Sequence, residues 1–172
     1  MSARNDDVTG HTREAASTHE VGANSADSDP DAAPPPVGFR PVARRSGFLD
    51  LIGPLHVDET DPRAPVYGLR VGEQHTNSRG GVHGGVLSTL TDVALGYGTL
   101  AAHGATLALV TASLTIDFTG TANVGDWLEA RTTLKRIGSR LAFASCEITS
   151  NGRTVASSSG VFSVPPAGQP EH

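Results

Sequence analysis

The sequence predicts an α+β domain in which one antiparallel sheet curls around a single long helix. The only long helical pattern runs from His83 to about Ala102, where apolar residues recur every three or four positions. Segments that alternate apolar and polar residues precede and follow this helix. A sheet of five or six such strands buries one helix only by wrapping around it, so we expect the helix at the centre.

The first 45 residues are polar and contain many alanines and prolines but hardly any large apolar side chain. Burial cannot then offset the entropy of ordering, about 1–2 kcal/mol per residue. We therefore expect residues 1–45 to form a disordered tail. The folded domain should span residues 46–165, followed by a short C-terminal tail at residues 166–172.

The ordered part is expected to begin with a short helix at Gly47–Gly53, where four apolar residues lie between two glycines. Leu55–Thr60 and Val66–Val71 alternate apolar and polar residues on either side of a proline-containing turn, which predicts two antiparallel strands. A polar, glycine-rich loop at His75–Val82 then leads into the long helix.

The long helix should have one buried stripe and one face of small or polar residues. The predicted stripe consists of Val86, Leu90, Val93, Ala94, Tyr97, Leu100 and Ala101. The other face carries Gly85, Ser88, Asp92, Gly96 and Thr99, with Leu95 as the one large apolar exception. Its small side chains would let another backbone or a ligand approach the helix closely.

Four further strands are predicted after Gly104, at Leu107–Phe118, Trp127–Arg136, Leu141–Ser150 and Thr154–Val164. The turns between them are short and contain glycine, asparagine or aspartate. This pattern predicts an antiparallel meander in chain order.

Charge and cysteine content argue against several classes of function. The net charge is −5 and no run of lysine or arginine occurs, so nucleic acid is not an expected partner. Cys146 is the single cysteine and no secretory signal pattern is present, which indicates a cytoplasmic protein. No apolar stretch approaches the roughly 20 residues that span a bilayer, so no membrane association is expected.

The sequence also lacks the patterns of common cofactor sites. It has no Cys/His set with zinc spacing, no phosphate-binding loop with lysine and no serine nucleophile elbow. We therefore expect no metal and no cofactor.

The segment His75–Val86 reads HTNSRGGVHGGV and is followed by Asp92 on the helix. This combination resembles the loop and central helix of the hotdog-fold acyl-CoA thioesterases, in the 4-hydroxybenzoyl-CoA thioesterase superfamily. Val110–Phe118 and the turn Gly120–Asp126 are also similar to that family. The most similar branch is that of the phenylacetate-degradation and human-type thioesterases. The resemblance implies a hotdog fold and hydrolysis of an aryl or short- to medium-chain acyl-CoA to the free acid and CoA.

The start of the helix and Asp92 are the expected centre of catalysis. Gly84 and Gly85 lie in the first helical turn, where unpaired N–H groups and the helix dipole would stabilise negative charge on a thioester carbonyl. Asp92 would attack that carbonyl or activate water, because a buried carboxylate is costly unless it is paired or has such a role. The alternatives are glycines that only open the helix and a carboxylate that faces solvent.

The resemblance assigns roles to three further residues. Asn77 would polarise the carbonyl or hold the water, although it could be an ordinary turn residue. His83 would position the loop and the donor groups, with general acid catalysis as the less favoured role. Thr111 would orient the water beside Asp92, although threonine is also common in strands.

Arg136 and Arg140 flank the turn Ile137-Gly138-Ser139 and resemble a basic hairpin that contacts the nucleotide of CoA in the family. Exposed arginines are more often simply solvated. With that alternative open, the expected CoA-binding residues are Gly85, Arg79, Arg136, Gly138, Ser139 and Arg140.

In the family the site forms between two subunits, so the resemblance implies a homodimer or a dimer of dimers. Two other functions remain open at this point. One is a noncatalytic acyl-CoA-binding sensor, and the other is a dehydratase or an acyl-carrier hydrolase on the same fold.

Overall fold

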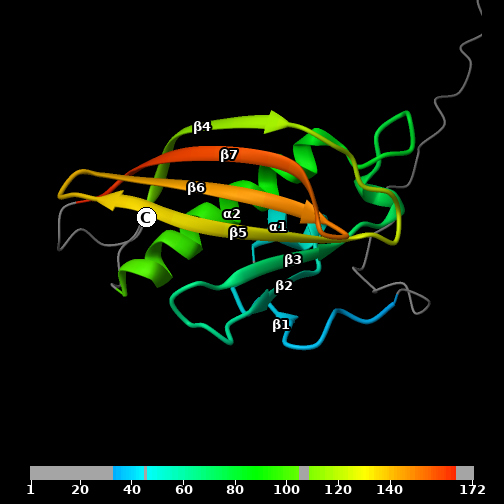
Figure 1. Cartoon of the computed structure of the whole chain (residues 1–172), viewed down its shortest axis with the longest axis horizontal. Helices are drawn as coiled ribbons and strands as arrows, with labels where there is room; N and C mark the ends of the chain where they lie inside the picture. The colour runs from blue at the N-terminus through cyan, green and yellow to red at the C-terminus, as the bar shows by residue number, and fades with distance from the viewer. Residues whose placement is uncertain (1–32, 45, 105–108, 166–172) are drawn as a thin grey trace, which may run out of the picture.

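The computed structural model describes residues 33–44, 46–104 and 109–165. Within these residues, an antiparallel seven-stranded sheet curls around helix α2, Gly84–His103 (Figure 1). The strands are β1 (Arg40–Pro41), β2 (Leu55–Asp58), β3 (Val66–Arg70), β4 (Val110–Phe118), β5 (Trp127–Ile137), β6 (Leu141–Ser150) and β7 (Arg153–Ser163). The predicted α+β architecture is confirmed, with more strands than the five or six expected.

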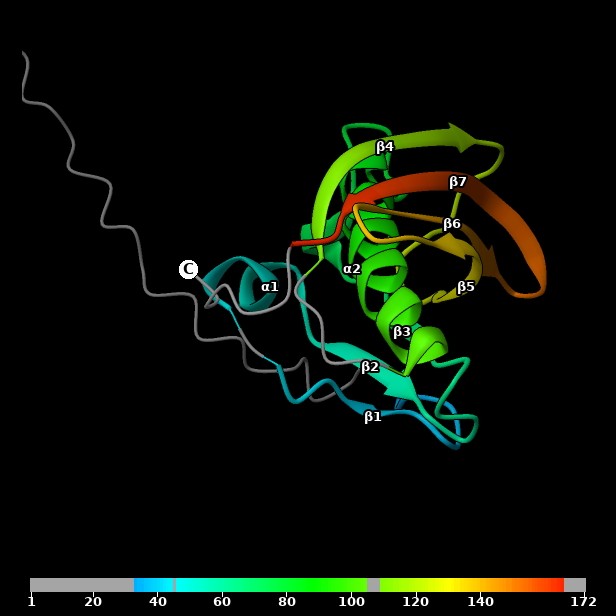
Figure 2. The ribbon, with the colours of Figure 1, turned by 90° about the vertical axis from the view of Figure 1, so that its left-hand side faces the viewer.

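Two short helices complete the described fold. Helix α1, Gly47–Ile52, begins where the Ser46 hydroxyl accepts a hydrogen bond from the Leu49 N–H group at 3.2 Å. A single 3₁₀ turn, η1 (Glu73–His75), follows β3. Figure 2 shows α1 on the side of α2 that the sheet leaves open.

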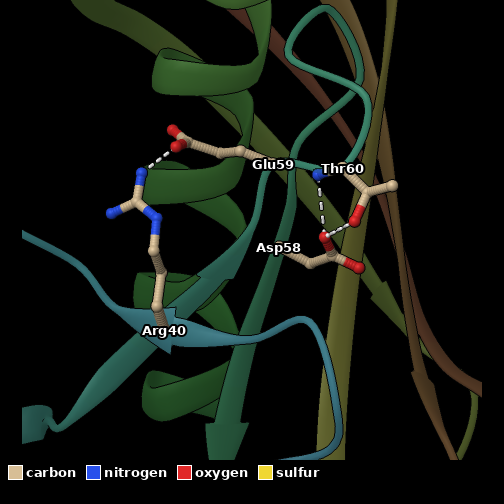
Figure 3. A network of polar contacts seen from close by, with 4 residues as sticks. All are labelled: Arg40, Asp58, Glu59 and Thr60. Atoms are coloured by element: carbon tan, nitrogen blue, oxygen red, sulfur yellow. Dashed lines mark hydrogen bonds and ion pairs between the residues drawn. The ribbon is translucent and has the colours of Figure 1, made fainter.

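Strand β1 lies within the segment that we expected to be disordered. It pairs antiparallel with β2, and Arg40 forms an ion pair with Glu59 just beyond β2 (Figure 3). The Phe39 ring also packs edge-on against Trp127, with ring centroids 5.0 Å apart. One aromatic side chain and one pair of charges thus order residues well before residue 46, and composition averaged over the segment hides them. Residues 1–32, 45 and 166–172 of the two predicted tails lie outside the described residues.

The meander is only partly as predicted. Strands β5, β6 and β7 are consecutive neighbours, but β4 pairs with β7, and β5 pairs with β3. The predicted turn at Asn123–Asp126 therefore closes no hairpin between β4 and β5. Its backbone bonds instead to Val71, through Val71 N–H to Asp126 O at 2.9 Å and Gly125 N–H to Val71 O at 2.8 Å. The chain crosses from one edge of the sheet to its middle at this point.

The buried face of α2 differs from the predicted stripe. The buried residues are Val86, Leu87, Leu90, Thr91, Ala94, Leu95, Gly98 and Thr99. Val93, Tyr97, Leu100 and Ala101 are only half-buried, whereas Leu95 and Thr99, which we had placed on the opposite face, are fully buried. The curled sheet contacts α2 on several sides, so the covered arc is wide and is not centred on the most apolar stripe.

Helix α2 approaches the sheet closely at Gly98. A Cβ atom on Gly98 would lie 2.7 Å from Thr132 Cβ on β5. Thr132 also donates a hydrogen bond to the Ala94 carbonyl at 2.8 Å. Glycine therefore lets the helix backbone lie close to the Thr132 side chain, and the Thr132 hydroxyl ties the middle of the helix to the sheet.

The core lies between α2 and the inner face of the sheet. Its most deeply buried large side chains are Leu69, Leu90, Leu95, Leu128, Ile148 and Phe162. None of the helices in the described segments is both long enough and apolar enough to cross a bilayer.

The cluster around Trp127 provides a test of this packing. A Cβ atom on Gly68 would lie 2.2 Å from Trp127 Cζ2 and 2.9 Å from Phe39 Cε1. We expect Gly68→Ala to lower the free energy of unfolding by about 1–3 kcal/mol, because the extra methyl overpacks the cluster. Urea denaturation measures this change. Gly47→Ala is the control, since its Cβ would meet no atom within 4 Å, and equal stability of the two variants would contradict the packing.

Candidate active site

The first turn of α2 leaves one backbone donor available. His83 is the N-cap, and its Nδ1 atom accepts a hydrogen bond from Gly85 N–H at 2.9 Å. Val86 N–H donates to the His83 carbonyl at 2.9 Å. For Gly84 N–H, no acceptor occurs among the described residues. Of the two glycines predicted to face the thioester, Gly84 has the free donor, while the Gly85 amide already bonds to the imidazole.

An aromatic ring from β4 lies beside this donor. A Cβ atom on Gly84 would be 3.3 Å from Phe118 Cζ and 3.5 Å from Phe118 Cε1. The Phe118 side chain is nevertheless 54% exposed. The helix start is therefore bordered by an aromatic ring that is partly exposed to solvent.

Asp92 and Thr111 lie beside each other in the folded chain, as the resemblance implied. Thr111, on β4, donates its hydroxyl hydrogen to Asp92 Oδ1 at 2.8 Å. Asp92 is half-buried on the open side of α2. Thr111 fixes one carboxylate oxygen, while Oδ2 makes no hydrogen bond with the described residues and can act on another group.

Asn77 organises the loop that precedes α2. Its Oδ1 atom accepts from Arg79 N–H at 2.8 Å, and its Nδ2 group donates to the Val82 carbonyl at 3.2 Å. The backbone closes the same turn, with Asn77 N–H donating to Gly81 O at 2.8 Å. The side chain thus has the turn-forming geometry that we named as the alternative, and one Nδ2 hydrogen is left for another acceptor.

Gly84 and Asp92 do not meet within one chain. They are eight positions apart on the same straight helix, which corresponds to about 12 Å along its axis. A carbonyl oxygen bound at Gly84 N–H would be far beyond the reach of the Asp92 carboxylate of that chain. A single thioester carbonyl therefore cannot contact both groups of one chain.

The predicted CoA-binding residues lie in three places. Arg79 is exposed in the loop before α2, and Gly85 is exposed in the first turn of α2. The exposed hairpin that joins β5 to β6 carries Arg136, Gly138, Ser139 and Arg140. Figure 1 shows this hairpin at the opposite end of the molecule from the start of α2.

Two hollows on the described surface contain none of the predicted catalytic residues. One, of about 400 Å³, lies over β5, β6 and β7 and includes Arg131, Glu147 and Cys146. The other, of about 180 Å³, lies between the N-terminal segment and α2 and includes Arg44, Tyr67 and Tyr97. Burial raises the pKa of Cys146 to about 11, so its thiol is protonated near neutral pH and is a poor nucleophile.

Comparison with known proteins identifies the family. The family model described as "Thioesterase superfamily" matches residues 79–157. The candidate esterase PA0474 of Pseudomonas aeruginosa is 47% identical over 130 residues, which cover 76% of this chain and 97% of that protein. The chain belongs to the thioesterase superfamily.

Solved structures agree with this assignment. The Escherichia coli PaaI protein from the phenylacetic acid degradation operon is 26% identical, with a TM-score of 0.63 over 70% of this chain and 86% of that one. A hypothetical thioesterase protein with coenzyme A from Streptococcus pneumoniae has the same fold, with a TM-score of 0.59 at 22% identity, covering 65% of this chain and 89% of that one. The hotdog fold implied by the resemblance is confirmed, and as a superfamily member the chain is a thioester hydrolase.

The sequence did not single out two residues that border the candidate site. Phe118 was part of the resemblance, but its position beside Gly84 depends on how the end of β4 meets the start of α2. His75 was also part of the resemblance, as the first residue of the loop pattern, but it was assigned no role. The described residues contain no group of three His, Cys, Asp or Glu side chains placed to bind a metal ion, and His75 is instead buried beside the loop.

Two buried histidines make the stability of this thioesterase dependent on pH. Burial is the main cause that lowers the pKa of His56 and of His75 below the usual value of 6.5. The unfolded chain therefore binds more protons than the folded one between the lowered pKa values and pH 6.5. The stabilisation is fully present above pH 6.5 and decreases as the pH falls below it.

We expect the free energy of unfolding, measured by urea denaturation from pH 8 to pH 5, to fall on the acid side of pH 6.5. His75→Gln should make this dependence weaker. The lowered pKa values of Asp58 and Asp126 change the free energy of unfolding only around and below pH 3.8, so they do not mask the effect of the histidines. A free energy of unfolding that stays constant between pH 8 and pH 5 would contradict buried neutral imidazoles at both positions.

Proposed function

We propose that the chain hydrolyses an acyl-CoA to the free acid and CoA, with Asp92 as the catalytic carboxylate and Gly84 N–H as the oxyanion donor. The observation that supports this most is the free amide of Gly84 at the start of the helix that also holds Asp92. Membership in the thioesterase superfamily supports the reaction type, and the loop and helix residues support the roles.

The helix start would polarise the thioester carbonyl. Gly84 N–H, at the positive end of α2, would donate to the carbonyl oxygen and stabilise the negative charge that develops there. His83 has a positioning role in this scheme, because its Nδ1 atom already holds the neighbouring amide. Asn77 would shape the loop and offer its remaining Nδ2 hydrogen to the carbonyl or to a water molecule.

Asp92 would act through the oxygen that Thr111 leaves free. In one route the carboxylate attacks the carbonyl carbon, the C–S bond breaks with release of CoA, and water then hydrolyses the mixed anhydride. In the other route Asp92 takes a proton from a water molecule that attacks the carbonyl. Both routes need Asp92 ionised and Thr111 donating to its Oδ1.

Two chains would complete each site. If two α2 helices pack antiparallel about a two-fold axis near Ser88, Gly84 of one chain lies opposite Asp92 of the other. The small side chains on the open side of α2 suit such an approach. Strand β4 is at the edge of the sheet, and its Val110 side chain is 59% exposed. We therefore propose a homodimer, or a dimer of dimers, as the active form.

The basic hairpin would bind the phosphates of CoA. Arg136 and Arg140 are exposed on either side of the Gly138-Ser139 turn, and Arg79 is exposed in the loop before α2. Guanidinium groups suit phosphate recognition because they donate paired hydrogen bonds. The bound coenzyme A in the Streptococcus pneumoniae structure supports a CoA thioester as the substrate.

Asp92→Asn tests the role of the carboxylate. The amide keeps the size of the side chain but removes its charge, so we expect kcat to fall by roughly 10²–10⁴-fold. Thiol release from an acyl-CoA measures kcat, and thermal denaturation checks the fold. Asp117→Asn is the matched control, since Asp117 is an exposed carboxylate on the same strand as Thr111. Near-normal turnover by Asp92→Asn would exclude the proposed role.

Mixed dimers test the shared site. Asp92→Asn and Gly84→Val should each be inactive, because one lacks the carboxylate and the other blocks the donor. After random mixing, half of the dimers contain both variants, and each of these has one intact site, so we expect about a quarter of the wild-type activity. A mixture that remains inactive would show that both groups act within one chain.

A panel of aryl-, short-chain and medium-chain acyl-CoAs identifies the acyl group and tests the sensor alternative. Thiol release should occur with at least one member of the panel. Tight binding without thiol release from any member would favour a noncatalytic acyl-CoA sensor instead.

A further inference from the structure

His75 is a histidine side chain with only 1% of its surface exposed, at the end of η1. It lies where three segments of the chain meet: the end of α1, the turn after β3 and the loop that leads to α2. The superfamily reaction as set out above gives this imidazole no role.

Both ring nitrogens of His75 have backbone partners. Nδ1 accepts a hydrogen bond from Gly72 N–H at 2.9 Å, and Nε2 lies 2.7 Å from the carbonyl oxygen of Ile52, the last residue of α1. A carbonyl oxygen can only accept, so Nε2 must carry the hydrogen. The neutral ring with its proton on Nε2 satisfies both contacts, whereas a doubly protonated ring would point its Nδ1 hydrogen at the hydrogen of Gly72 N–H.

The backbone of His75 connects directly to the candidate active site. Its carbonyl oxygen accepts from His83 N–H at 2.8 Å, and His83 is the residue that caps α2 just before Gly84. The next residues, Thr76 and Asn77, pair with Val82 and Gly81 across the loop. A shift of the imidazole would therefore move the His83 backbone and the loop together.

We propose that His75 is a positioning residue, whose neutral imidazole fixes the loop and the start of α2 relative to α1. This inference rests on the proposed function, since it assigns His75 to the placement of Gly84 N–H and Asn77. Catalysis by a backbone donor is sensitive to position, and a misplacement of about 1 Å can cost roughly 100-fold in rate. The burial that lowers the pKa of His75 also favours the neutral ring at physiological pH.

Two variants separate the two contacts of the ring. The side-chain amide of asparagine coincides with the Nδ1 position, so His75→Asn keeps an acceptor for Gly72 N–H but loses the bond to Ile52. The longer glutamine reaches the Nε2 position. His75→Gln therefore keeps a donor to the Ile52 carbonyl but loses the acceptor for Gly72 N–H. We expect each variant to lower kcat by roughly 10- to 100-fold while KM changes by no more than about threefold.

His56→Gln is the matched control. His56 is also a buried histidine whose pKa burial lowers, but it lies on β2 beside Trp127, with ring centroids 5.5 Å apart. We expect His56→Gln to lower the free energy of unfolding, as the His75 variants do, but to leave kcat unchanged. A decrease in kcat that is the same in His56→Gln and in the His75 variants would overturn the proposal, because it would report only a general loss of packing.

Nitrogen-15 NMR of the wild-type chain tests the proposal independently of catalysis. At pH 7 the His75 ring should be the neutral tautomer with its hydrogen on Nε2, and the amide signals of His83 and Gly84 should shift in the His75 variants but not in His56→Gln. A hydrogen on Nδ1 in the wild type, or unchanged His83 and Gly84 signals in the variants, would overturn it. If the wild type hydrolyses no thioester, the proposed function fails while these NMR results still decide whether His75 positions the loop.

Discussion

The structure depends on the burial of α2 by a sheet that reaches it from several sides. Leu90, Ala94 and Leu95 have no exposed surface, so the helix cannot rotate or slide without opening the core. The residues that border the candidate site are positioned relative to this helix. The unpaired amide of Gly84 is at its start, and Asp92 is two turns further along.

The fixed rise of an α-helix then determines what a single chain can do. Because about 12 Å separate the Gly84 amide from Asp92, the helix that supplies both groups also keeps them apart. In the dimer that we propose, the same spacing would place each donor opposite the other chain's carboxylate. The hydrogen bond from Thr111 has the complementary effect of holding Asp92 toward the open side of α2.

The sequence predicts much of this arrangement because the relevant signals are local. Three of these signals depend only on neighbours in the chain. They are the helical period of residues 83–102, the alternation in Leu141–Ser150 and the loop pattern before Gly84. The errors occur where distant segments decide the outcome. Strand β4 pairs with β7 at the edge of the sheet and not with β5, and β1 is ordered by Phe39 on Trp127 and by Arg40 with Glu59. The position of Phe118 beside Gly84 and the buried bonds of His75 also depend on tertiary packing, so composition and period cannot predict them.

The contact between Gly98 and Thr132 has a consequence for the entry of substrate. Because α2 is held this closely to the middle of the sheet, we expect the segments around the helix, and not the helix itself, to make room for a substrate. The pieces available for that are α1, the turn formed by residues 76–82 and the end of β4 at Phe118. A larger residue at position 98 would push α2 away from Thr132 and weaken this attachment of the helix to the sheet.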